Sequence, residues 1–167
     1  VRQVATFKPS QLVLVDLAET PLHDIRLMMK QEFPSIPCLT LTASICHYTH
    51  MEAIFKKYSP EYVFHAAAYK HVPMMEDNPG EAVLNNIRGT RIIADIASQY
   101  GTKKFVMIST DKAVNPTNVM GCSKRICEMY CQALNAKLDS ESSEHTQFVT
   151  TRFGNVLGSN GSVIPLF

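Results

Sequence analysis

The sequence predicts an α/β domain built on a doubly wound parallel sheet. Three observations favour this fold class: short apolar runs alternate with helical segments, the runs lack a regular polar face, and polar motifs follow several of them. Strands that helices cover on both faces show such continuous apolar runs, and the alternation implies parallel crossover connections. The 167 residues are 46% hydrophobic, which suffices for one domain with a sizeable core.

The predicted strands are short, and turn residues or helix caps separate them. In chain order they cover residues 11–16, 37–42, 62–66, 105–109 and 147–153. The predicted helices lie between them, over residues 20–33, 49–58, 78–101 and 117–137. Thr20 and Pro21 are typical of a helix cap and a first helical position. Thr49 and Glu52 fit a capping box, and Gly101 predicts a helix end.

Charge and composition exclude several classes of protein. The 16 basic and 15 acidic side chains are interspersed, which argues against a nucleic-acid or membrane-surface partner. No apolar run approaches the roughly 20 residues that span a bilayer, and the first residues do not resemble a signal peptide, so we expect a cytoplasmic protein. The cysteines are expected to be reduced and buried or half-buried, and their spacing does not indicate a metal site: Cys38, Cys46, Cys122, Cys127 and Cys131.

The richest cluster of chemical groups follows the fourth predicted strand. The run Ser109–Lys112 lies at the carboxyl end of that strand, and residues 120–124 follow on the next helix. In an open α/β sheet, ligands bind at this edge. Asp111 and Lys112 are predicted to act as an acid–base pair, although an exposed ion pair of little energetic value is the alternative. The S-x-x-K spacing does not indicate a penicillin-binding enzyme, because the partner motifs S-D-N and K-T-G are absent.

Two further strand ends carry candidate residues. Asp16 closes the first strand, where an acid can accept hydrogen bonds from ribose hydroxyls; a surface acid at a strand end is the alternative. His65 and the small residues Ala66, Ala67 and Ala68 close the third strand, and small side chains there let backbone approach a flat ring or a pyrophosphate. Tight helix packing would use the same alanines, and His65 alone is more typical of a buried core histidine.

The helix after the fourth strand places Met120 and Lys124 on one face, four residues apart. In dehydrogenase-like chemistry a Tyr and a Lys have this spacing, but a methionine cannot transfer a proton. From physics alone, Met120 is core filler and Lys124 an ordinary helix lysine. A last motif, residues 152–162, has three glycines after the fifth strand, but it does not match the phosphate-binding loop G-x-x-x-x-G-K-[ST].

Taken together, these motifs resemble the extended short-chain dehydrogenase/reductase superfamily, with an NAD(P)-binding Rossmann-like fold. More narrowly, they resemble the nucleotide-sugar 4,6-dehydratases of bacterial capsule, O-antigen and flagellin-glycan synthesis. The matching segments are residues 15–16, 62–73, 85–90, 109–116, 120–124 and 152–159. The resemblance implies that both ends are cut: the glycine-rich loop upstream and a substrate domain downstream are missing. Residues 1–167 are then a partial domain, which favours a folded but inactive fragment.

The resemblance also implies roles for particular residues. Those implied to be catalytic are Thr110, Asp111, Lys112, Met120 and Lys124. Those implied to bind the NAD or NADP cofactor are Asp16, Ser44, Ile45, His65, Ala66, Ala67, Ala68, Asn86, Ser109, Lys124, Phe153, Asn155 and Val156. Those implied to bind substrate are Lys70, His71, Thr110, Asn155 and Ser162, although Lys70 and His71 could equally face solvent.

The implied reaction converts a UDP-N-acetylglucosamine-type substrate into a 4-keto-6-deoxy sugar, with Lys112 as base and Asp111 as acid. A nucleotide-sugar 4-epimerase and a non-catalytic dinucleotide-binding module are the alternatives. The adjacent Asp111 and Lys112 count against the epimerase, whereas Met120 and the missing ends favour the module. The resemblance further implies a homo-oligomer, and a membrane anchor upstream of the catalytic domain.

Overall fold

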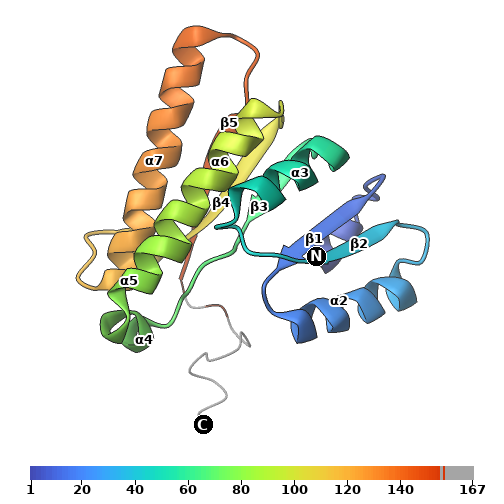
Figure 1. Cartoon of the computed structure of the whole chain (residues 1–167), viewed down its shortest axis with the longest axis horizontal. Coiled ribbons are helices and arrows are strands. Elements are labelled where there is room, and N and C mark those ends of the chain that lie inside the picture. The colour runs from blue at the N-terminus through green and yellow to red at the C-terminus, as the bar shows by residue number, and fades with distance from the viewer. Residues whose placement is uncertain (155, 157–167) are drawn as a thin grey trace.

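Parallel strands in two sheets form the centre of the structure, a computed structural model that describes residues 1–154 and 156 (Figure 1). The strands are β1 (Leu12–Asp16), β2 (Cys38–Thr42), β3 (Tyr62–His65), β4 (Lys104–Thr110) and β5 (Gln147–Phe153). The longer helices are α2 (Glu19–Glu32), α3 (Tyr48–Tyr58), α6 (Gly89–Gln99) and α7 (Val119–Glu141). The shorter ones are α1 (Arg2–Ala5), α4 (Val72–Asp77), α5 (Pro79–Glu81), the π-helix η1 (Ala82–Arg88) and the 3₁₀ turn η2 (Asp111–Ala113).

The predicted parallel α/β architecture is confirmed, with one difference in the sheet. β1 pairs with β2, and β3, β4 and β5 form a second sheet in that order, all in parallel. Within the described residues no ladder joins β1 to β3, so the strands fall into two sheets where a single doubly wound sheet was predicted. Within the second sheet, Thr110 of β4 is in register with Phe153 of β5, so the two strands end side by side.

The main core lies between the β3–β4–β5 sheet and the helices α3, α6 and α7 (Figure 1). Phe105 and Met107 of β4 are fully buried there against Ile96 of α6. Side chains alternate along β4, so the opposite face of this sheet carries Phe64 and Val149 with substantial exposure. No helix within the described residues is both long and apolar enough to cross a bilayer.

Helix boundaries differ from the prediction mainly between β3 and β4. The single helix predicted over residues 78–101 is instead α5, η1 and α6 in succession, and α4 precedes it. Gly101 has φ of +68°, which confirms the predicted glycine stop. The capping box is wrong: α3 begins at Tyr48 without a side-chain cap, and Glu52 accepts a hydrogen bond from the Tyr48 hydroxyl instead.

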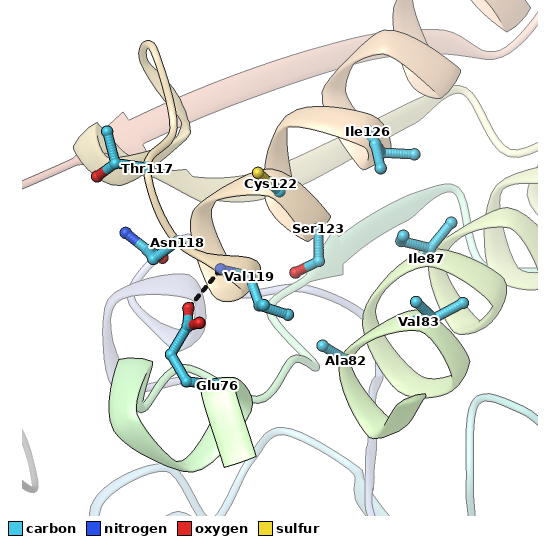
Figure 2. A pocket seen from close by; sticks show the side chains of 10 residues that line it. All are labelled: Glu76, Ala82, Val83, Ile87, Thr117, Asn118, Val119, Cys122, Ser123 and Ile126. Carbon is cyan, nitrogen blue, oxygen red and sulfur yellow. Dashed lines mark hydrogen bonds between the residues drawn. The ribbon is translucent and has the colours of Figure 1, made fainter. Parts of the chain in front are cut away.

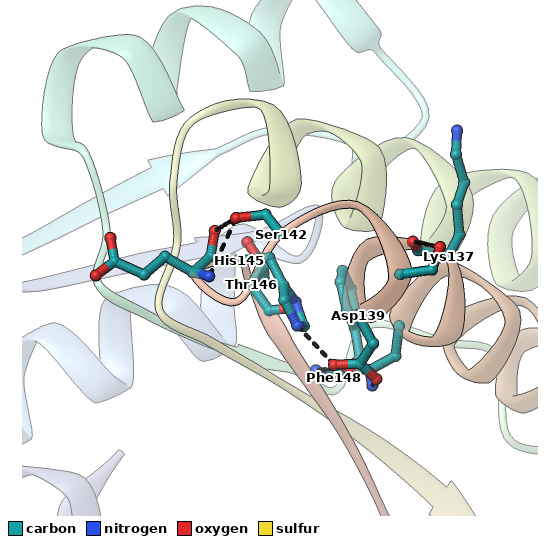
Figure 3. A network of polar contacts seen from close by, with 9 residues as sticks. Lys137, Asp139, Ser142, His145, Thr146 and Phe148 are labelled. Atoms are coloured by element: carbon teal, nitrogen blue, oxygen red, sulfur yellow. Dashed lines mark hydrogen bonds and ion pairs between the residues drawn. The ribbon is translucent and has the colours of Figure 1, made fainter.

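A polar network closes the turn between α7 and β5 (Figure 3). One ring nitrogen of His145 lies 2.7 Å from the Asp139 carboxylate, and the other lies 2.8 Å from the Thr146 carbonyl. Both neighbours accept hydrogen bonds, so this geometry favours the protonated imidazole, and the bond to the Thr146 carbonyl raises the pKa of His145. Asn135 donates to Asp139 and accepts from the Phe148 backbone, each at 2.8 Å. The network extends α7 beyond its predicted end and fixes the start of β5.

Candidate active site

The Asp111–Lys112 turn forms the centre of the candidate site. Thr110 ends β4 in extended backbone, and its hydroxyl accepts a bond from the Lys112 backbone N–H, which starts the 3₁₀ turn η2. The same hydroxyl donates to Asp111 Oδ1 at 2.8 Å. Lys112 Nζ lies 3.3 Å from that oxygen, and the side chains of Lys112 and Asp111 are 39% and 56% exposed. A β-carbon placed on Gly154 would lie 3.9 Å from Asp111 Oδ2, so the end of β5 borders the carboxylate.

The hydrogen bonds around Asp111 favour its ionised form. The bond from the Thr110 hydroxyl lowers the pKa of the Asp111 carboxyl below its usual value, and the bonds from Lys112 act in the same direction. The turn therefore presents a carboxylate and an ammonium group in contact. As an exposed ion pair it adds little to stability. The pair places a proton donor and a proton acceptor together at the carboxyl end of β4.

The first turn of α7 packs directly on the backbone of this turn. A β-carbon on Gly121 would lie 2.3 Å from the Lys112 carbonyl oxygen, a distance that atoms cannot adopt. Glycine at this position is thus required by the close approach of two backbones. Asn118 caps the helix by accepting from the Gly121 N–H at 2.7 Å, and Glu76 of α4 accepts from the Val119 N–H at 2.7 Å.

Lys124 is buried one turn further along α7. Its Nζ donates to the Ile108 carbonyl at 2.9 Å, and burial lowers the pKa of its ammonium group. His65, at the end of β3, is also buried and bonds to the Thr90 hydroxyl at 2.8 Å. Burial and the charge of Lys124 lower the pKa of His65 to about 3, so this histidine is neutral. The geometry agrees with a core histidine that supports the strand end.

Asn86 fixes the loop after β3 against α7. Its side-chain oxygen accepts from the Tyr69 N–H at 2.8 Å, and its amide donates to the Tyr69 carbonyl at 3.1 Å. The amide also donates to the Ser123 hydroxyl at 2.9 Å, and that hydroxyl donates to the Met120 carbonyl. The loop that carries Ala68 and Lys70 is thereby tied to the helix that carries Lys124.

Glu128 is a buried carboxylate that the sequence motifs do not indicate. It is fully buried on α7 and accepts two bonds from Arg152 of β5, at 2.8 and 2.6 Å, and one from Arg125 at 3.0 Å. Burial alone would raise the pKa of Glu128, but these bonds outweigh burial and hold the pKa at about 2. The register partner of Arg152 is Ser109, whose buried hydroxyl also lowers this pKa. Glu128 thus ties α7 to the strand that leads into the last motif.

The remaining predicted residues occupy varied positions. Asp16 is exposed, and its Oδ1 accepts from the Ala18 N–H at 2.9 Å. Ser44 accepts from the Cys46 N–H, whereas the side chain of Ile45 is buried in the core against Gly89. Residues at the rim of the strand ends are exposed or half-buried: Ala66, Ala67, Ala68, Lys70, His71, Phe153 and Val156. Asn155 and Ser162 lie outside the described residues.

The Met120 side chain lies in an apolar cluster and not beside the Asp111 carboxylate, where a reacting group would be expected. Its side chain is buried and packs with Met75 and Ala82 in a small apolar cluster under α4 and η1. This agrees with the interpretation of Met120 as core filler. The structure also differs from the expectation for Cys122, which is exposed on the outer surface of α7.

A parallel α/β fold with a polar strand-end site defines a Rossmann-like domain of the short-chain dehydrogenase/reductase type. More specifically, the chain belongs to the family described as polysaccharide biosynthesis protein, which matches residues 1–167. This confirms the resemblance to capsular and nucleotide-sugar enzymes.

Individual relatives support the same assignment. The capsular polysaccharide biosynthesis protein CapD of Staphylococcus aureus is 47% identical over 99% of this chain, which spans 27% of CapD. A UDP-N-acetylglucosamine 4,6-dehydratase (inverting) of Campylobacter jejuni is 43% identical over 64% of the chain and 31% of its own length. A UDP-glucose 4-epimerase of Rickettsia canadensis is 47% identical over 64% of the chain and 30% of its own length. The crystal structure of Pen from Bacillus thuringiensis superposes with a TM-score of 0.88, at 34% identity, over 99% of this chain and 50% of Pen.

Proposed function

We propose that the protein is an NAD(P)-dependent nucleotide-sugar 4,6-dehydratase acting on a UDP-N-acetylhexosamine in polysaccharide biosynthesis. The observation that carries the proposal is the contact between Asp111 and Lys112, at 3.3 Å and at the carboxyl end of β4. Elimination of water across two neighbouring carbons needs a base and an acid close together, and this pair supplies both. The family membership and the dehydratase relative support the substrate class.

The residues at the strand ends fit a dinucleotide. One oxygen of Asp16 is engaged with the Ala18 N–H, so the carboxylate is held in place with its second oxygen available for ribose hydroxyls. Ala66, Ala67 and Ala68 after β3 are small and exposed or half-buried, and the ammonium group of buried Lys124 bonds to the Ile108 carbonyl near the carboxyl end of β4. A dinucleotide held by these residues would supply reversible hydride transfer, from C4 of the sugar and back to C6.

The chain's own residues account for the proton transfers. Asp111 and Lys112 share one exchangeable proton, which sits on the lysine in water. A bound sugar that excludes water would favour the uncharged pair, because burying separated charges is costly. Neutral Lys112 then takes the C5 proton as the C6–O bond breaks, and Asp111 protonates the departing hydroxyl to give water. The Lys112 ammonium, whose protons exchange with solvent, then delivers a solvent-derived proton to C5 as hydride is returned to C6, which leaves a 4-keto-6-deoxy sugar.

Other groups have supporting roles in this proposal. Thr110, whose hydroxyl donates to Asp111, is placed to bind near the sugar O4 once substrate is present. Met120 cannot remove the 4-hydroxyl proton, so Lys124 through water, Thr110 or Lys112 is the candidate. Lys70, His71 and the motif after β5 are proposed to contact substrate. Cytoplasmic placement, an upstream membrane anchor and a partial domain stay predictions.

A nucleotide-sugar 4-epimerase is the second candidate, because the epimerase relative is about as similar as the dehydratase. Epimerisation at C4 needs no acid for C6, so the adjacent Asp111 and Lys112 favour dehydration. The experiment incubates the native protein that carries this chain with UDP-N-acetylglucosamine in deuterated water. A 4-keto-6-deoxy product labelled at C5 supports the proposal, whereas the C4 epimer as sole product would refute it.

Matched variants separate this chemistry from general charge effects. Lys112→Ala and Asp111→Asn should abolish the product. Lys103 and Glu61 form a comparable exposed ion pair at the other end of β4, at 2.5 Å. Lys103→Ala should therefore leave turnover unchanged. If Lys103→Ala lost as much turnover as Lys112→Ala and Asp111→Asn, Asp111 and Lys112 would be ordinary surface charges.

A further inference from the structure

A network of charged side chains lies next to Lys124 on the buried face of α7. Glu128 follows Lys124 by four residues, so both side chains lie on the same face of the helix. Glu128 is fully buried and holds Arg152 of β5 through two bonds, at 2.8 and 2.6 Å. Arg125 adds a third bond at 3.0 Å. A buried carboxylate is tolerated only when it is paired in this way.

Stability alone does not account for the charge of Glu128. A buried ion pair contributes little relative to apolar side chains of similar size, although removing one of its partners is costly. Cys127 and Cys131, which are also on the buried face of α7, belong to the main hydrophobic core. An apolar residue at position 128 would extend that core, so the buried carboxylate calls for a further role.

The other titratable side chains close to Lys124 are uncharged at neutral pH. Burial and the charge of Lys124 lower the pKa of His65 to about 3. Burial raises the pKa of the Cys127 thiol, and it raises the pKa of Cys131 to about 12. Glu128 has a pKa of about 2 and is ionised. Burial lowers the pKa of Lys124, and the negative charge of Glu128 opposes that effect.

The cations of the network make Lys124 more dependent on Glu128. Arg125 and Arg152 each bond to the Glu128 carboxylate, which offsets their positive charges. Without that carboxylate, the lysine would lose an attraction and would also face two uncompensated guanidinium groups. The ion pair of η2 contains one charge of each sign, so it does not replace the lost carboxylate.

α7 is attached to its neighbours on both sides of Lys124. Figure 2 shows Glu76 of α4 bonded to the first turn of α7, where it accepts from the Val119 N–H at 2.7 Å. Glu128 ties a later turn of the helix to β5. Between these attachments, Lys124 Nζ donates to the Ile108 carbonyl at 2.9 Å. A lysine ammonium group has three N–H donors, so donors remain for a molecule bound at the carboxyl end of β4.

We propose that Glu128 is a positioning residue for Lys124. Its carboxylate keeps the Lys124 ammonium group charged inside the fold and holds the part of α7 that carries it, so that Lys124 can donate to the ribose hydroxyls of a dinucleotide. The inference rests on the proposed function only for the ligand of Lys124. The effect of Glu128 on the charge of Lys124 is a property of the fold, and it can be measured without substrate or cofactor.

The first test measures the charge of Lys124 by competitive labelling with acetic anhydride over a pH series, read by peptide mass spectrometry. It compares the native protein that carries this chain with its Glu128→Gln variant. Only the uncharged amine reacts, and dividing each rate by the plateau rate of the same lysine at alkaline pH cancels differences in exposure. For Lys124 this ratio should rise about tenfold at neutral pH in Glu128→Gln. Lys137, an exposed lysine of the same helix, is the internal reference and should not change.

The labelling experiment has results that would overturn the proposal. An unchanged ratio for Lys124 in Glu128→Gln would do so, and so would a wild-type Lys124 that is already uncharged at neutral pH, a result that needs no variant. Glu128→Asp keeps the charge on a shorter side chain, so its ratio should stay close to that of the wild type. A rise in Glu128→Asp equal to the rise in Glu128→Gln would assign the effect to lost packing, against the proposal.

The second test measures the Kd for NADH by fluorescence over a pH series. Glu128→Gln should raise the Kd about tenfold at neutral pH, and the difference from the wild type should shrink as the pH falls, because Lys124 of the variant then regains its proton. Glu144→Gln removes an exposed carboxylate before β5 and should leave the Kd unchanged at every pH.

The dependence on pH separates the proposed role from a purely structural one. A difference in Kd that stays constant with pH would show that Glu128 acts only as a structural support, and the proposal would be wrong. If both tests succeed and no dehydratase product forms, the proposed function fails and the effect of Glu128 on Lys124 stands. If turnover is normal and the labelling of Lys124 does not change, this inference alone fails.

Discussion

Replacing Gly121 with alanine tests the contact between α7 and the candidate active site. The added methyl group would lie 2.3 Å from the Lys112 carbonyl oxygen and 3.1 Å from its carbonyl carbon. Both atoms belong to the backbone, so no side-chain rotation can relieve the clash. Either the first turn of α7 or the Asp111–Lys112 turn must move.

The size of the movement follows from the distances. Contacts of a β-carbon essentially never fall below 3.0 Å, so the oxygen and the methyl group must separate by at least 0.7 Å. Overpacking of this kind costs about 1–3 kcal/mol, whereas alanine in a helix gains about 1 kcal/mol over glycine. The net loss of stability is therefore about 0–2 kcal/mol, or up to about 8 °C in Tm. With Asp111 and Lys112 in their proposed roles, displacing them by close to 1 Å should cost about 100-fold in rate.

The assay measures kcat and Tm of both the wild-type protein and the Gly121→Ala variant. We expect Gly121→Ala to fold and to lose roughly 10- to 100-fold in kcat. Gly80→Ala is the control, because beyond its chain neighbours and its own helix backbone no described atom lies within 4 Å of the position that its added methyl group would take. Wild-type kcat in Gly121→Ala would refute the reasoning that this backbone contact positions Lys112.

Three further predictions concern stability. Glu128→Gln removes the buried charge that Arg152 bonds, and it should lower the free energy of unfolding by about 3 kcal/mol in chemical denaturation. Asn86→Leu removes the partners of the partly buried Tyr69 N–H and carbonyl and should cost about 1–3 kcal/mol in the same assay. The bond to the Thr146 carbonyl raises the pKa of His145, so its contribution is complete below about pH 6.5 and is lost as the pH rises through the raised value. The Tm difference between the wild type and His145→Gln should accordingly shrink with rising pH.

Each of these predictions has an outcome that contradicts it. Glu144→Gln changes an exposed carboxylate and should alter stability by less than about 0.5 kcal/mol. If Glu128→Gln lowered the free energy of unfolding no more than Glu144→Gln does, the ion pairs of Glu128 would contribute nothing to stability. Unchanged stability in Asn86→Leu would show that the Tyr69 backbone finds other partners. A Tm difference for His145→Gln that is constant between acidic and basic pH would show that His145 is not charged in the fold.

Local patterns predicted most of the elements because strand and helix signals are short-range. β5 was predicted with the correct bounds from a run rich in β-branched and aromatic residues after a polar loop. The helix before β4 was predicted as continuous, although η1 interrupts it. No local propensity predicts a π turn, because it arises from the tertiary demand that Asn86 reach Tyr69 and Ser123.

In the candidate site, too, local features were predicted from the sequence and features that depend on tertiary contacts were missed. Asp111 and Lys112 were predicted together because neighbours in sequence are neighbours in space. Glu128 was missed because a glutamate on a long helix usually faces solvent, and its partner Arg152 lies on another strand. Its position one turn after Lys124 was the only signal within the helix. Which face of α7 is buried could have been inferred only from the arrangement of the sheet.

The π-helical segment η1 has a consequence for how the two halves of its helix are oriented. A π turn holds one residue more than an α turn, so it shifts the angular phase of everything beyond it by about 100°. Removing one residue between Ala82 and Arg88 would restore regular winding and rotate Val83 away from its present direction. Because of the additional residue, the continuous helix formed by η1 and α6 directs Asn86 toward the loop after β3 while Ile92 and Ile96 still pack against the sheet.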